Sequence, residues 1–257
     1  MRITLLQTDI TWASPHLNIG QAEEMIGAAP PSDLYVLPEM WSTGFATSPE
    51  GIAETDGLSL KWMKTTAQRC HAAISGSIAT ALPHHGGYSY LNRHYFVRPD
   101  GSHEQYDKRH LFSYGGEHLC YTRGENRCVA TYGGWRWLLL VCYDLRFPVW
   151  SRYRGDYDGI IIVANWPETR QAVWDTLLKA RAIENQCYVV AVNRTGSDSH
   201  NIYAGGSRVI DAKGKVVAEC SLHEVCTATA DIDIGDLLRF REKFRVLDDR
   251  DTFDIPQ

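Results

Sequence analysis

The sequence predicts an α/β protein folded as one domain over residues 1–257. Short apolar runs recur along the chain, as in 33–38, 137–141 and 159–164, and runs of this length suit strands buried on both faces of a parallel sheet. Segments with apolar residues at helical spacing lie between several of these runs. No linker or low-complexity segment interrupts the alternation, so a single domain is the economical interpretation.

The first half of the chain alternates predicted strands and helices up to a long loop. The predicted strands are residues 3–8, 33–38, 73–80, 88–98 and 104–108. Helices are expected over 18–29 and 58–71, where apolar residues fall on a common side, and Pro30 ends the first of them. Residues 109–124 are rich in Gly, His and Tyr and are predicted to form a loop.

The second half continues the pattern and adds hairpins. Its predicted strands are residues 128–132, 135–142, 159–164, 187–192, 206–210, 216–220 and 227–232. Gly133-Gly134 and the segment 211–214 provide hairpin turns. Residues 174–185 are predicted to be helical, as is an Arg-rich segment at 234–245.

Composition and charge argue against several kinds of partner. The net charge of −5 gives no basic face for nucleic acid. No apolar run approaches the roughly eighteen residues of a membrane span, and the N-terminus becomes polar too soon for a signal peptide. Seven cysteines, an odd number without a CxxC pair, fit reduced thiols in the cytoplasm better than a disulfide framework.

The absence of several known sequence motifs narrows the possible cofactors and catalytic groups. The ten histidines and seven cysteines show no zinc-ligand spacing, so we expect no metal. Neither G-x-G-x-x-G after a strand nor G-x-x-x-x-G-K-[ST] occurs, which argues against a nucleotide cofactor. The G-x-S-x-G pattern of serine hydrolases is absent as well. A Cys–His protease stays open, although no His is singled out as a partner.

Three polar residues stand where a parallel sheet would place reactive groups. Cys142 follows an apolar strand, and open α/β sheets carry their sites at the carboxyl ends of strands. A free Cys can equally be a small residue packed in the hydrophobic core. Glu39 also follows a strand directly, where it could act chemically, cap the next segment or pair with an Arg. Lys108 could be an ordinary solvated surface residue.

Motifs around these residues resemble the nitrilase, or carbon–nitrogen hydrolase, superfamily. The motifs that carry the resemblance are Leu37-Pro38-Glu39-Met40, Tyr106-Asp107-Lys108-Arg109-His110-Leu111-Phe112 and Cys142-Tyr143-Asp144-Leu145-Arg146-Phe147-Pro148, with supporting matches at 164–167, 180–185 and 193–194. They follow the family's order over nearly the whole chain. The segment 108–112, Gly116-Glu117-His118 and Tyr121-x-x-Gly124 look most like the bacterial ω-amidases.

The resemblance implies a four-layer α-β-β-α sandwich that needs no cofactor and pairs with a second copy into a homodimer. It also implies a role for each matching residue. Glu39 corresponds to the general base, Lys108 to the oxyanion-stabilising lysine and Cys142 to the nucleophile. Glu117 is the best match for a second family glutamate, with Glu125 as a nearby rival.

These roles lead to an expected mechanism through a thioester on Cys142. A free thiol is only a few per cent thiolate at neutral pH, so we expect Glu39 to accept its proton and a nearby cation to lower its pKa. Lys108 and the backbone N–H of Tyr143 would stabilise the oxyanion. Water, activated by Glu39 and positioned by Glu117, would then hydrolyse the thioester.

The resemblance further implies a small amide substrate, namely a 2-oxo-dicarboxylic monoamide such as 2-oxoglutaramate or 2-oxosuccinamate. The aromatic residues expected to wall the substrate cavity are Trp41, Phe45, Tyr114 and Trp166, with Tyr143 beside the nucleophile. Arg146 and His118 are candidates for binding the distal carboxylate, although Arg146 could instead be a structural ion-pair partner.

Two kinds of alternative remain open at this stage. The chain could belong to another branch of the superfamily, as an N-carbamoyl amino acid hydrolase, an aliphatic amidase or a nitrilase. It could also be a catalytically silent scaffold of the same fold that binds a partner. Retention of Glu39, Lys108 and Cys142 together favours an enzyme.

Overall fold

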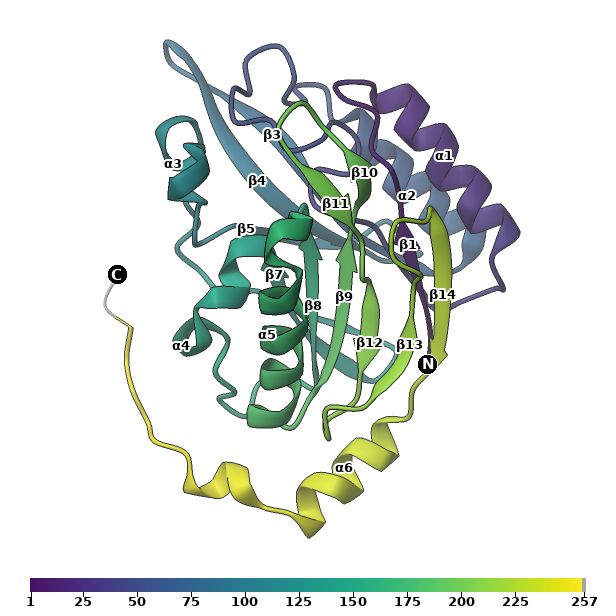
Figure 1. Ribbon diagram of the computed structural model, residues 1–257, viewed down its shortest axis with the longest axis vertical. Coiled ribbons are helices and arrows are strands. Elements are labelled where there is room, and N and C mark those ends of the chain that lie inside the picture. The colour runs from purple at the N-terminus through teal and green to yellow at the C-terminus, as the bar shows by residue number, and fades with distance from the viewer. Residues whose placement is uncertain (256–257) are drawn as a thin grey trace.

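Two six-stranded β-sheets face each other and helices cover their outer faces, so the chain forms a four-layer α-β-β-α sandwich (Figure 1). The computed structural model describes residues 1–255. The fold expected from the sequence is confirmed. No helix within the described residues is long and apolar enough to cross a membrane.

The first sheet has the strand order β14-β1-β2-β3-β4-β5. Its strands are β1 (Arg2–Gln7), β2 (Leu34–Val36), β3 (Ala73–His84), β4 (Gly87–Val97), β5 (His103–Asp107) and β14 (Cys226–Asp231). The central strands β1, β2 and β3 run parallel, and the outer strands pair antiparallel. Helices α1 (Pro15–Ala28) and α2 (Leu58–Cys70) cover this sheet, and their buried apolar residues form one cluster with those of its strands.

The second sheet has the order β13-β12-β9-β8-β7-β6. Its strands are β6 (Val129–Tyr132), β7 (Trp135–Val141), β8 (Gly159–Ala164), β9 (Tyr188–Asn193), β12 (Arg208–Ile210) and β13 (Val216–Glu219). The strands β7, β8 and β9 run parallel. Helix α5 (Gln171–Glu184) covers this sheet and buries Trp174, Leu178 and Ala182. Helices α4 (Pro148–Ser151) and α6 (Ile234–Lys243) and the 3₁₀ turn η4 at Val246–Asp249 lie in the second half of the chain.

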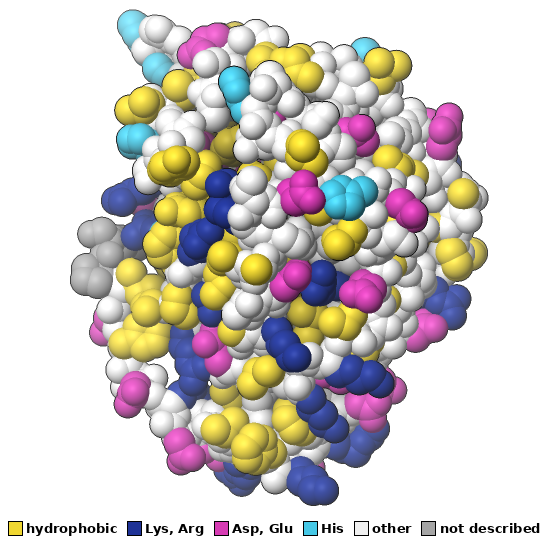
Figure 2. All heavy atoms as spheres, viewed as in Figure 1, with side chains coloured by type: hydrophobic (Ala, Val, Ile, Leu, Met, Phe, Trp, Pro, Cys, Tyr) yellow, Lys and Arg dark blue, Asp and Glu magenta, His cyan; other side chains and the backbone are white. Residues whose placement is uncertain are grey.

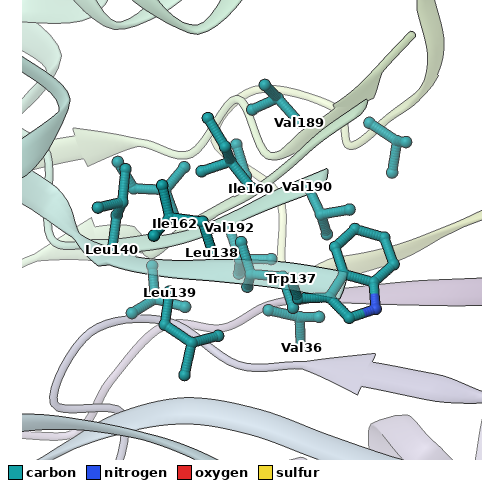
Figure 3. Close-up of a cluster of buried hydrophobic side chains, with 14 of the residues drawn as sticks. Val36, Trp137, Leu138, Leu139, Leu140, Ile160, Ile162, Val189, Val190 and Val192 are labelled. Carbon is teal, nitrogen blue, oxygen red and sulfur yellow. The ribbon is translucent and has the colours of Figure 1, made fainter. Parts of the chain in front are cut away.

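The main hydrophobic core involves both faces of β7 (Figure 3). Trp137 and Leu139 lie on the side of β7 that faces Val36 of β2, and Leu138 and Leu140 lie on the other side. All five side chains have no exposed surface. Each such side chain contributes about 1.5–3 kcal/mol of burial free energy. Burial of both faces explains why residues 137–141 of this strand are an unbroken apolar run.

Two parts of the chain differ from the predicted elements. The predicted loop at 109–124 contains two short helical segments, η1 (Ser113–Gly115) and α3 (Glu117–Cys120). A small hairpin of β10 (Thr195–Ser197) and β11 (Ile202–Ala204) was not predicted. Segments of three or four residues are too short to show a hydrophobic period, which is why the sequence did not indicate them.

Candidate active site

The residues expected to carry the chemistry follow three strand ends and one loop, and the structure brings them together. Glu39 comes three residues after β2, Lys108 directly after β5 and Cys142 directly after β7. Glu117 is the first residue of α3. Because β2 and β5 belong to one sheet and β7 to the other, the site is assembled across the two sheets, beside the carboxyl ends of β2 and β7.

Strained backbone marks both segments that bear the expected base and nucleophile. Cys142 has a φ of 43° and Met40, next to Glu39, has a φ of 41°. Left-handed φ values are uncommon for residues other than glycine and persist where the surrounding structure enforces them. Near Cys142 the backbone is constrained by a hydrogen bond of 3.0 Å, which the Asp144 carboxylate accepts from the Val141 N–H. The chain thus leaves β7 in a sharp turn into the 3₁₀ helix η2 (Cys142–Arg146).

A lysine held between two carboxylates forms the centre of the site. Lys108 Nζ lies 2.8 Å from Glu39 Oε1 and 2.9 Å from Glu117 Oε2, and none of the three side chains has any exposed surface. Glu117 Oε2 also accepts a hydrogen bond of 2.6 Å from the Phe112 N–H. These contacts fix the lysine ammonium in one place.

Close approach of the backbone also holds Lys108. The Gly124 N–H donates to the Lys108 carbonyl at 2.9 Å. A Cβ atom at position 124 would lie 2.0 Å from the Asp107 carbonyl oxygen, so this position requires glycine. The loop that begins after Lys108 therefore returns to it at Gly124.

Two asparagines that the sequence did not single out complete the polar network. Asn92 of β4 donates from Nδ2 to Glu39 Oε1 at 2.7 Å and to Glu117 Oε1 at 3.0 Å. The Asn165 N–H, directly after β8, donates to Glu39 Oε2 at 2.8 Å, and its Nδ2 donates to the Glu39 carbonyl at 2.8 Å. Both oxygens of Glu39 therefore have fixed partners.

The electrostatics keep the lysine charged and the thiol neutral in the resting site. Burial alone would lower the pKa of Lys108, but Glu117 and Glu39 outweigh it, and the pKa of Lys108 lies above its ordinary value. Burial raises the pKa of Glu117, with Lys108 acting in the opposite direction. Burial and then the charge on Glu39 raise the pKa of the Cys142 thiol well above 9.0.

This result corrects one expectation from the sequence. Lys108 does favour the thiolate of Cys142, but burial and Glu39 dominate, so the nearby cation does not lower the net thiol pKa. Deprotonation of Cys142 must therefore depend on proton transfer to a base as the reaction proceeds.

The site opens into a cavity of about 340 Å³. Four of the aromatic residues expected to contact the substrate, Phe45, Tyr114, Tyr143 and Trp166, line it together with Glu39, Lys108 and Cys142. The Phe45 ring centroid lies 5.4 Å from Lys108 Nζ. Residues that line the cavity without having been singled out include Thr47, Phe112, Arg170, Asp198, Asn201 and Tyr203. Several of these come from the unexpected β10–β11 hairpin and the turn within it.

Two arginines line the cavity without an acidic partner among the described residues. The Arg146 guanidinium lies 5.0 Å above the Trp166 ring, and that of Arg170, in the 3₁₀ turn η3 (Glu168–Arg170), lies 5.4 Å above the Phe112 ring. Stacking on an aromatic face leaves the N–H groups of a guanidinium available to a ligand. On the face seen in Figure 2, Lys and Arg side chains lie beside hydrophobic ones between α3 and the β10–β11 hairpin.

The structure does not bring three other candidates to the cavity. Trp41 is buried in the core, where its ring lies 4.9 Å from that of Trp62. His118 is exposed because α3 turns successive side chains by about 100°, so that Glu117 points inward and His118 outward. Glu125, the rival of Glu117, is also exposed.

A four-layer sandwich that brings a half-buried Cys together with a buried Lys and two buried Glu defines a cysteine hydrolase of the nitrilase type. Comparison with known proteins agrees with this class. Residues 2–242 match the sequence model of the family described as carbon-nitrogen hydrolase. The chain belongs to the carbon–nitrogen hydrolase family.

Relatives in this family are similar over almost their whole length. The Omega-amidase YafV of Escherichia coli (strain K12) is 42% identical over 254 residues, which cover 98% of this chain and 98% of that protein. The 2-oxoglutaramate amidase of Bacillus subtilis (strain 168) is 37% identical over 255 residues, or 96% of each. One solved structure is that of XC1258 from Xanthomonas campestris, a CN-hydrolase superfamily protein with an arsenic adduct in its active site. It is similar to this protein with a TM-score of 0.93 and 39% sequence identity, and the match covers 100% of this chain and 99% of that one.

Proposed function

We propose that this protein is an ω-amidase, which hydrolyses the terminal amide of short 2-oxo-dicarboxylic monoamides such as 2-oxoglutaramate and 2-oxosuccinamate to the acid and ammonia. The catalytic part of this proposal rests on the position of Lys108. Its ammonium lies 2.8 Å from Glu39 and 2.9 Å from Glu117, on the wall of the cavity that Cys142 also lines. The names of the full-length relatives, omega-amidase and 2-oxoglutaramate amidase, support the substrate class.

The first half of the reaction forms a thioester. Glu39 accepts the proton of Cys142 as the sulfur attacks the amide carbonyl, because the raised pKa of Cys142 leaves little thiolate beforehand. Lys108 and the N–H of Tyr143, at the start of η2 where helical N–H groups have no internal acceptor, stabilise the oxyanion. Glu39 then gives its proton to the nitrogen, the C–N bond breaks, and ammonia leaves.

The second half hydrolyses the thioester. Water gives a proton to Glu39 and adds to the thioester carbonyl. The C–S bond then breaks as Glu39 returns the proton to the sulfur, which releases the acid and regenerates the Cys142 thiol and the Glu39 carboxylate. Glu117 contributes by holding Lys108 in position through two contacts, of 2.9 and 3.2 Å. Because Lys108 stays protonated throughout, its charge serves both tetrahedral intermediates.

Recognition of the distal carboxylate is assigned to the two cavity arginines. Arg146, one of the two residues expected for this role, lines the cavity, whereas the other, His118, is exposed. Arg170 offers a second guanidinium on the same cavity. A guanidinium binds a carboxylate through charge-assisted and often bidentate hydrogen bonds, so either residue suits a substrate with a free acid group.

Ammonia release measured on a panel of substrates tests the proposal. We expect the highest kcat/KM for 2-oxoglutaramate, with lower values for glutamine, a simple aliphatic amide, an N-carbamoyl amino acid and a nitrile. Preference for one of the last three would reassign the protein to another branch of the family. The variant Cys142→Ala should lose turnover and keep its unfolding midpoint, and a variant that retains turnover would exclude Cys142 as nucleophile.

The assembly and location are also proposals. We infer a homodimer of single-domain subunits, supported by the family resemblance and by exposed apolar residues on the outer helices, such as Ile183 and Leu238 at 48% and 52% exposure. Light scattering in solution tests it. A cytoplasmic location is supported by the free thiols of all seven cysteines, and cell fractionation tests that inference.

A further inference from the structure

Asn92 is a neutral side chain that reaches both carboxylates of the site. It lies on β4 with no exposed surface, and its Nδ2 donates to Glu39 Oε1 at 2.7 Å and to Glu117 Oε1 at 3.0 Å. Lys108 contacts the same two oxygens, at 2.8 and 3.2 Å. Asn92 and Lys108 therefore form two bridges between the same pair of acids.

A second polar residue fixes which way the Asn92 amide points. The Met40 N–H donates to Ser77 Oγ at 2.9 Å, so the Ser77 hydroxyl is already an acceptor there and directs its own proton elsewhere. Asn92 Oδ1 lies 2.9 Å from Ser77 Oγ and can only accept. Because ionised carboxylates only accept, the NH₂ group of Asn92 faces Glu39 and Glu117, and its amide oxygen accepts from the Ser77 hydroxyl.

The charges of the site explain why such a donor is needed. Glu39 and Glu117 are both fully buried and share one cation, Lys108. Two neighbouring carboxylates favour protonation of one of them, which would remove the base that Cys142 needs. Two N–H bonds from a neutral amide stabilise the ionised carboxylates and add no charge that would compete with Lys108 for them.

We propose that Asn92, oriented by Ser77, is a positioning residue that keeps Glu39 ionised as the base and fixes Glu117 against Lys108. The inference rests on the proposed cysteine chemistry but not on the identity of the amide substrate. The hydrogen bond from Asn92 acts to lower the pKa of Glu117, in keeping with this role.

Substitution of Asn92 should alter the pH dependence of the site. In Asn92→Ala the carboxylates lose a donor that favours their charged form, so the acid limb of the kcat profile should move by about one unit to higher pH. We expect kcat at neutral pH to fall roughly 10- to 100-fold while KM changes little, because Asn92 contacts the acids and does not line the cavity.

Alkylation of Cys142 by iodoacetamide provides a readout that needs no substrate. The charge on Glu39 raises the pKa of Cys142, so loss of the donor that favours this charge should move the onset of alkylation in Asn92→Ala to lower pH, opposite to the shift of the kcat profile. If the substrate assignment is wrong, turnover is uninformative but this shift is still observed. If the alkylation profile of Asn92→Ala matches that of the unmodified protein, the proposal is overturned whatever the substrate.

Two further variants separate positioning from simple loss of stability. Asn185→Ala removes another fully buried asparagine, which bonds to the Arg181 carbonyl and the Tyr153 N–H away from the cavity. It should lower the unfolding midpoint without moving either pH profile, and a matching shift would overturn the proposal. Ser77→Ala keeps Asn92 but frees its orientation, so a smaller shift of each profile in the same direction as in Asn92→Ala is expected. If Asn92→Ala does not fold, Ser77→Ala decides the matter, and an unchanged profile overturns the proposal.

Discussion

Asp144 accepts two hydrogen bonds from His110, at 3.0 Å from the backbone N–H and at 2.7 Å from Nδ1. The same buried carboxylate accepts from the Val141 N–H at 3.0 Å and from the Tyr106 hydroxyl at 2.8 Å. His110 follows Lys108 by two residues, and Asp144 follows Cys142 by two residues. One carboxylate therefore ties the loop of the catalytic lysine to the turn of the nucleophile.

Removal of this carboxylate should destabilise the fold as well as the site. In Asp144→Ala, the donors of Val141, Tyr106 and His110 lose their acceptor in a buried place, and each unsatisfied donor costs about 1–3 kcal/mol. We expect the free energy of unfolding, measured in urea, to fall by about 3 kcal/mol or more. The matched control is Asp231→Asn, which breaks an exposed ion pair with Arg2 and should leave the free energy of unfolding nearly unchanged.

The raised pKa of Cys142 can be separated from its catalytic role by changing Glu39. Burial contributes most to the raised pKa and the charge of Glu39 comes next, so Glu39→Gln should lower the pKa of the thiol. We expect this variant to be alkylated at Cys142 faster than the unmodified protein near pH 8, and at the same time to lose turnover because the base is gone. Peptide mass mapping distinguishes Cys142 from the other cysteines. Slower alkylation of Cys142 in Glu39→Gln would show that Glu39 does not oppose the thiolate.

His94 should make the fold sensitive to mild acid. Burial lowers its pKa to about 4, and its ring nitrogens lie 2.8 Å from Ser75 Oγ and 3.1 Å from the Leu140 carbonyl oxygen. Between about pH 6.5 and 4 the unfolded chain binds a proton at this histidine and the folded chain does not, so stability falls as the pH drops through this window. The full loss is on the order of 3 kcal/mol.

Urea unfolding measured from pH 7 to pH 4.5 checks this linkage. The slope of stability against pH should be shallower in His94→Gln than in the unmodified protein, although His94→Gln starts less stable. His118→Gln, which removes an exposed imidazole, serves as the control for loss of a histidine. Equal slopes in the unmodified protein and His94→Gln would contradict the assignment.

The sequence predicted those parts of the fold and site that leave a local pattern. Residues 137–141 of β7 and the whole of β8 are continuous apolar runs because both faces are buried, and the polar residue after the first run, Cys142, stands at the sheet edge. Glu39 shows the same arrangement after β2. The segments of Lys108 and Glu117 show no such pattern, and only the family motifs pointed to them.

The missed residues depend on contacts between segments far apart in the chain. Asn92 lies in an alternating strand like any other inward polar residue, and its role appears only because the fold brings its side chain within hydrogen-bond distance of both Glu39 and Glu117. Trp41 was predicted to line the cavity but lies in the core, because an aromatic residue near the base in sequence can pack in either place. The direction of His118 depends on a four-residue helix that no hydrophobic period could reveal.

The two cavity arginines should control specificity for the acid group of the substrate. A charge-assisted hydrogen bond to a carboxylate contributes about 1.5–3 kcal/mol, which corresponds to roughly a 10- to 150-fold change in binding. Arg146→Leu and Arg170→Leu are therefore expected to raise KM for 2-oxoglutaramate by about tenfold or more, and to leave kcat/KM for a neutral short amide nearly unchanged. Steady-state ammonia release on both substrates measures the difference.

Arg123→Leu, which removes an exposed arginine that does not line the cavity, should change neither value. If one of the two cavity variants behaves like Arg123→Leu, the other arginine alone binds the carboxylate; if both do, the carboxylate is bound elsewhere.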